Sequence, residues 1–77
     1  MRTLEFYGWE KEGRIGEAAS YGHANRLLDM LVTETATGVE ADVIDGADVI
    51  WRGVLPDMAA AKAEAIAQAR RRFIRLL

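Results

Sequence analysis

The fold is decided by residues 39–73, VEADVIDGADVIWRGVLPDMAAAKAEAIAQARRRF, in which a strand pair leads directly into a long helix. From Val39 to Val43 apolar residues alternate with acidic ones, and a second apolar run follows an Asp-Gly pair, which is typical of a β-hairpin. Pro56 cannot continue a strand ladder, and Asp57 offers a side-chain oxygen to cap the amides of a following helix. We therefore predict a hairpin followed by a helix over 58–77.

Two registers of this hairpin are compatible with the sequence. A two-residue turn at Asp45-Gly46 has the strongest local preference, but it places Val43 opposite Asp48 and mixes polar with apolar pairs. A three-residue connection places Val43 opposite Val49 and gathers the apolar side chains on one face. We prefer the second register, because burial of a whole face outweighs the preference of a single turn.

The first twenty residues predict a second, weaker hairpin. Residues 3–9 are rich in large and aromatic side chains, which favours a strand. Gly13 suits a turn because glycine adopts positive φ without steric cost, and residues 14–19 return through small side chains. The two segments are expected to pair as antiparallel strands.

Residues 21–35 fit two different periodicities. Their apolar positions, Ala24 and Leu27 among them, follow the spacing of one helical face, which predicts a helix over 21–35. Leu28, Met30 and Val32 also alternate as they would in a strand over 27–35. We favour the helix and keep the strand as the alternative.

These elements predict an α+β fold of order ββαββα, in which a four-stranded antiparallel sheet carries both helices on one face. A chain of 77 residues and 8.5 kDa has room for one small core, so we expect a single domain over 1–77. The C-terminal helix is expected to turn one stripe toward the sheet, made of Ala59, Ala63, Ile66, Phe73, Ile74 and Leu77.

The composition excludes several classes of protein. With 51% apolar and 29% charged residues, the chain should be globular rather than disordered. It contains no cysteine and one histidine, so a disulfide scaffold and a Cys-His zinc site are excluded. No run approaches the roughly 20 apolar residues of a membrane span, and the charged start is unlike a signal peptide. We therefore expect a cytoplasmic protein.

Acidic residues gather on and around the predicted second hairpin. On an outer sheet face they would attract a basic partner and speed its association. The acidic spacing does not match a calcium-binding loop, and no polar cluster converges as in an active site, so we predict no metal, no cofactor and no enzymatic activity. The candidate protein-binding residues are Glu40, Asp42, Asp45, Asp48, Trp9 and Ile50.

The C-terminal segment has the opposite charge. Residues 61–77 hold five basic side chains and one acidic one, whereas residues 1–60 hold five basic and eleven acidic ones. Clustered arginines neutralise phosphates, so a nucleic-acid-binding accessory protein is the alternative function. Consecutive helical residues point about 100° apart, however, which argues against one compact patch. The residues of this alternative are Arg70, Arg71, Arg72 and Arg75.

The stretch from Val39 to Phe73, with its strand, Asp-Gly turn, second strand containing Trp51-Arg52-Gly53 and Ala-rich helix, resembles small orphan proteins of phages and prophages, a group that includes anti-CRISPR inhibitors. The resemblance implies a small, non-enzymatic protein that occupies the surface of another macromolecule. It transfers no residue role. The expected function is an interaction module or inhibitor that binds a basic protein through an acidic sheet face, with a homodimer as a further expected association.

Overall fold

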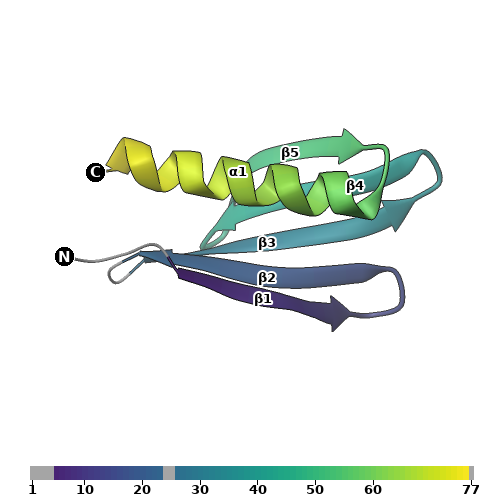
Figure 1. Ribbon diagram of the computed structural model, residues 1–77, viewed down its shortest axis with the longest axis horizontal. Helices are drawn as coiled ribbons and strands as arrows, with labels where there is room; N and C mark the ends of the chain where they lie inside the picture. The colour runs from purple at the N-terminus through teal and green to yellow at the C-terminus, as the bar shows by residue number, and fades with distance from the viewer. Residues whose placement is uncertain (1–4, 24–25, 77) are drawn as a thin grey trace.

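The computed structural model describes residues 5–23 and 26–76, which form an antiparallel sheet and one helix (Figure 1). The elements are β1 (Glu5–Glu12), β2 (Gly16–His23), β3 (Arg26–Thr35), β4 (Gly38–Asp45), β5 (Asp48–Leu55) and α1 (Met58–Leu76). The five strands lie in the order β1-β2-β3-β4-β5, so each strand pairs with its neighbours in sequence. The helix α1 packs across β2 to β5 on one face of the sheet.

The predicted ββαββα order is wrong, because the sheet has five strands and the described part of the chain has one helix. The error lies in the predicted helix over 21–35, because residues 21–23 end β2 and residues 26–35 form β3, while Ala24 and Asn25 lie outside the described residues. Leu28, Met30 and Val32 are fully buried against α1, whereas Leu27 is 52% exposed on the other side of the sheet. The strand alternative is therefore confirmed. Pairing with both β2 and β4 buries this alternating set at the centre of the sheet.

The first hairpin is confirmed, with its strands displaced toward the C-terminus. The strand β1 begins at Glu5 and runs to Glu12, so only part of the predicted segment 3–9 is in it, and residues 3 and 4 lie outside the described residues. Gly13 occupies the turn with φ of 70°, a conformation that side chains other than glycine rarely adopt.

The C-terminal helix is confirmed, and its cap is formed as predicted. The Asp57 carboxylate accepts a hydrogen bond of 2.8 Å from the backbone amide of Ala60. The predicted inner stripe is rotated, because Ala59, Ala63 and Ile74 are exposed, and Leu77 lies outside the described residues. Only Phe73 of that stripe is fully buried and Ile66 is half-buried. The observed stripe repeats every four residues and consists of Ala61, Ala65, Ala69 and Phe73.

Both registers considered for the β4–β5 hairpin are wrong, because the pairing contains a β-bulge. The bulge allows a two-residue turn and also keeps the apolar side chains on one face. The turn has two residues, Gly46 and Ala47, with Asp45 paired to Asp48. The pairing then shifts by one residue at Ile50, which lies as an extra residue in β5. Val43 consequently pairs with Trp51, and the apolar residues of β4 keep the side of the sheet that faces α1. A tight turn and a common side for the apolar residues of the hairpin are thus both obtained.

Candidate functional site

The face of the sheet opposite α1, here called the open face, presents its side chains in rows across the strands. Cross-strand pairing forms one row from β1 to β5 that consists of Glu10, Ala18, Leu31, Asp42 and Arg52. The row thus begins with a carboxylate on β1, crosses small and apolar residues at the centre, and ends in a carboxylate and a guanidinium.

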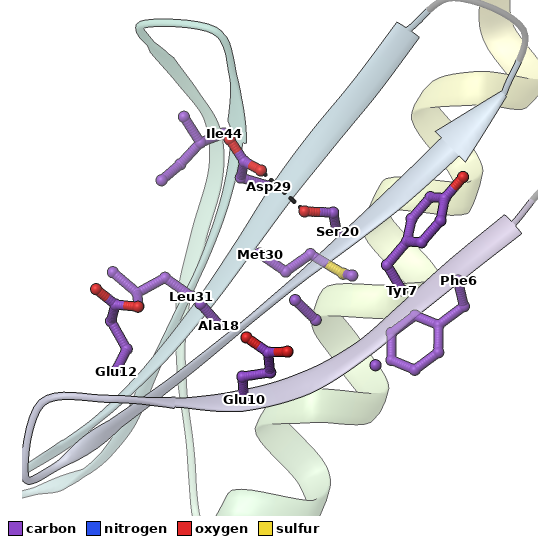
Figure 2. Close-up of a pocket in the computed structure, with 12 residues that line it drawn as sticks. Phe6, Tyr7, Glu10, Glu12, Ala18, Ser20, Asp29, Met30, Leu31 and Ile44 are labelled. Atoms are coloured by element: carbon purple, nitrogen blue, oxygen red, sulfur yellow. Dashed lines mark hydrogen bonds between the residues drawn. The ribbon is translucent and has the colours of Figure 1, made fainter.

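A second row of the open face lies beside the first. It consists of Tyr7, Ser20, Asp29, Ile44 and Val49, again in the order β1 to β5. The hydroxyl of Ser20 donates a hydrogen bond of 3.0 Å to a carboxylate oxygen of Asp29 (Figure 2). Tyr7 projects to the open face, whereas the neighbouring Phe6 projects to the other side of β1 and packs near Tyr21.

The strand β2 contributes only small side chains to the open face. A concavity of about 800 Å³ lies over this strand, between larger side chains from β1 and β3 (Figure 2). We call it the β2 trench. The small residues that leave this space are Ala18 and Ser20, and the trench is lined from the two neighbouring strands by Tyr7, Glu10, Glu12, Asp29 and Leu31.

The charges that line the β2 trench are all negative. Glu10 and Glu12 are exposed and form no hydrogen bond or ion pair with any side chain in the described ranges. Asp29 is bonded to the neutral Ser20, and no basic residue lines the trench. Tyr7 donates a hydrogen bond of 2.6 Å to Glu5, and this bond and the Glu5 charge raise the pKa of the Tyr7 phenol. The trench therefore combines three uncompensated carboxylates with apolar and aromatic walls.

The predicted site residues Glu40 and Asp42 do lie on the open face, but a cation holds both of them. Arg52 Nε lies 2.9 Å from Glu40 and 2.8 Å from Asp42, and a second guanidinium nitrogen lies 3.3 Å from Asp42. Asp42 is only 8% exposed. The hydrogen bond to Asp42 and the charges of Asp42 and Glu40 raise the pKa of Arg52, so the guanidinium remains charged. The single guanidinium of Arg52 therefore offsets one of the two carboxylate charges, and it pairs with both groups.

The other predicted protein-binding residues are not brought together with this pair. Asp45 lies on the side of α1, where Arg26 binds it at 2.6 Å, and Asp48 is exposed at the end of the hairpin. Trp9 also faces the helix side, with Lys62 Nζ 5.5 Å from its ring centroid. Ile50, the bulge residue, is half-buried and packs against the core.

The arginines of the C-terminal helix are divided in the same way. Arg70 and Arg71 are exposed, whereas Arg72 is half-buried and approaches Asp45 at 3.7 Å. The side chain of Arg75 lies outside the described residues. Arg71 and Arg72 nevertheless both line a cavity beside Trp51, so two of the consecutive arginines meet at one place.

The sequence did not predict the trench carboxylates, because the strands that hold them were not predicted over those positions. Glu10 and Glu12 lie beyond the predicted strand over 3–9 and next to the turn at Gly13, and Asp29 lies within the predicted helix over 21–35. The alternation of Leu28, Met30 and Val32 was the available signal, because in a strand it places Asp29 on the opposite face, but the same residues also fit a helix.

No protein-family model, curated protein or solved structure gives a significant match to this chain. Within residues 5–23 and 26–76, no three acidic or histidine side chains gather closely enough to hold a metal ion. The helix α1 lacks the apolar character that crossing a bilayer requires, and the described chain has no other helix of that length.

Proposed function

We propose that this chain is a small, non-enzymatic protein-interaction module or inhibitor, which binds a basic segment of another protein in the β2 trench. The observation that carries the proposal is the set of carboxylates from Glu10, Glu12 and Asp29 around a concavity with no basic residue in its lining. Uncompensated charge of one sign in a concave surface concentrates a partner of the opposite sign and accelerates its association. The resemblance to phage and prophage orphan proteins, anti-CRISPR inhibitors among them, is compatible with such a role.

The walls of the trench suit lysine and arginine side chains in particular. These side chains have an aliphatic stem that packs on apolar surface and a charged end that seeks a carboxylate. Tyr7 and Leu31 offer surface for the stem, and Glu10 or Asp29 offers an acceptor for the charged end. The small residues of β2 leave room for the backbone of the bound segment. Glu40 and Asp42 contribute less, because Arg52 already occupies their oxygens.

The test uses a fluorescein-labelled oligo-arginine peptide as a defined probe, with binding followed by fluorescence anisotropy. The variant Glu10→Gln/Glu12→Gln removes two carboxylates from the trench and is expected to weaken binding roughly 2- to 30-fold, since an exposed ion pair contributes about 0.2–1 kcal/mol. Raising the salt concentration should reduce the difference between the variant and the original chain.

A matched control removes the same two charges from the other side of the molecule. Glu34 and Glu64 have no ion-pair partner in the described ranges, and Glu→Gln changes at both leave the net charge equal to that of the trench variant. This control should bind the peptide nearly as well as the original chain. Equal weakening of both variants would show that net charge alone attracts the peptide, and the trench proposal would then be wrong.

A further inference from the structure

A second cavity, of about 220 Å³, lies on the helix side of the sheet between α1 and β5. Ile50 and Trp51 line it from β5, and Gln68, Arg71 and Arg72 line it from α1. The three helical residues stand at positions i, i+3 and i+4, so they share one face of α1 and point to the same space. This cavity is remote from the β2 trench, because the sheet separates the two faces.

The guanidinium groups at this cavity have few hydrogen-bond acceptors. Arg72 makes no hydrogen bond within the described ranges, and its Nε is buried without a partner. Its closest acidic atom, a carboxylate oxygen of Asp45, lies 3.7 Å away, which is beyond hydrogen-bond distance. Arg71 donates one long bond of 3.4 Å to Gln68. Buried polar groups are nearly always paired, so an unpaired arginine nitrogen here requires an explanation.

The local charge points to the same kind of ligand. Asp45 is the carboxylate nearest to Arg72, and it is already bound by Arg26 at 2.6 Å. Arg71 has no acidic partner in the part of the chain that the structure describes. Two guanidinium groups therefore line the cavity, and the only nearby negative charge among the described residues is that of Asp45, which Arg26 also binds.

We propose that the cavity between α1 and β5 is a binding site for a small phosphate-type oxyanion, which Arg71 and Arg72 would hold with their free N–H groups. Arginine presents several donors in a planar fork that matches the oxygens of phosphate and carboxylate. A cavity of about 220 Å³ is smaller than the sites of drug-sized ligands, which begin at about 300 Å³, so the ligand is a small anion or one phosphate group of a larger molecule. The rings of Trp51 and the side chain of Ile50 close the site on the β5 side.

Trp51 provides a direct optical measurement of binding. The chain has two tryptophans, so a Trp9→Phe background leaves Trp51 as the sole tryptophan fluorophore. We would titrate this protein with inorganic phosphate, with adenosine monophosphate and with a short single-stranded DNA, at constant ionic strength maintained with chloride. A saturable change in Trp51 emission with at least one of the first two anions is the expected result. No saturable response to either would overturn the proposal.

Matched arginine variants separate a built site from general basic charge. Arg71→Gln/Arg72→Gln should weaken binding more than 10-fold, whereas Arg70→Gln, which removes the neighbouring exposed charge, should change it less than 2-fold. A single Arg71→Gln variant keeps the test decisive if the double variant does not fold. DNA binding that falls equally in the Arg70→Gln and Arg71→Gln variants, with no response to inorganic phosphate, would overturn the cavity site and indicate a diffuse basic surface instead.

Discussion

Removal of the Phe73 ring should cost the protein a large part of its stability. Phe73 is 1% exposed, and its ring centroid lies 6.2 Å from that of Tyr21 on β2, so it joins the end of α1 to the sheet. Substitution of a buried phenylalanine by alanine typically costs about 3–5 kcal/mol. A domain of 77 residues is stable by only about 4–12 kcal/mol, from roughly 0.05–0.15 kcal/mol per residue. Phe73→Ala should therefore lower the thermal midpoint by more than about 10 °C.

The adjacent residue supplies a control of similar hydrophobicity. Ile74 is 61% exposed, and Ile74→Ala should cost less than about 1 kcal/mol because little of its surface is buried. Urea unfolding followed by circular dichroism measures both losses, with the slope of the transition expected to stay unchanged. The inner stripe predicted from the sequence contains both Phe73 and Ile74, so it would give equal losses of stability for the two variants. Equal losses, or a larger loss for Ile74→Ala, would refute the observed rotation of α1.

The remaining predictions concern the helix ridge, a glycine and a tyrosine. Ala65→Leu should lower the free energy of unfolding in urea by about 1–3 kcal/mol, because Ala65 is fully buried. The control Ala63→Leu, at an exposed position, should change it by less than about 0.5 kcal/mol. Equal effects of the two variants would contradict the packing of α1. Gly53→Ala should also destabilise the protein by about 1–3 kcal/mol, because the added Cβ would lie 2.7 Å from the Trp51 ring. In the same assay Gly8→Ala should be neutral, because its Cβ would meet no atom within 4 Å. Glu5→Ala should lower the pKa of Tyr7, as measured by the ultraviolet absorbance of phenolate, because the bond to Glu5 raises that pKa. The raised pKa means that this bond stabilises the fold at pH values below about 10 and is lost as the pH rises beyond that value, so an unchanged titration in Glu5→Ala would contradict the assignment.

The C-terminal half of the fold was largely predictable because its patterns are local. Asp57 caps the helix through an atom three residues from its target, and the alternation from Val39 to Val43 identifies the buried face of β4 without knowledge of its neighbours. The rotation of α1 was not predictable in this way. A sheet that supplies large side chains favours contact with the alanine ridge through Ala65, and that preference depends on the opposing surface.

The middle of the chain could not be assigned because two periodicities coincide there. Leu27 and Leu28 satisfy a helical stripe, while Leu28 and Met30 satisfy a strand, and only the partners β2 and β4 decide between them. The candidate site follows from the same choice. Once residues 26–35 form a strand, Asp29 turns to the face shared with Glu10, and the trench becomes visible.

The register of the second hairpin failed for a different reason. Each simple register satisfies either the turn or the apolar face, and a bulge at Ile50 satisfies both at the cost of one unpaired residue. A bulge depends on the twist and packing of the finished sheet, so the alternation of Val43 with its neighbours does not predict it.

The position of α1 at the end of the strand order has a consequence for synthesis on the ribosome. All five strands leave the exit tunnel before residues 58–76 do, and hairpins between adjacent strands need only short chain closures. Until α1 emerges, the nascent sheet would expose Leu28, Met30 and Val32 to solvent as one apolar surface. A chaperone that binds apolar surface on nascent chains would meet that surface before α1 covers it.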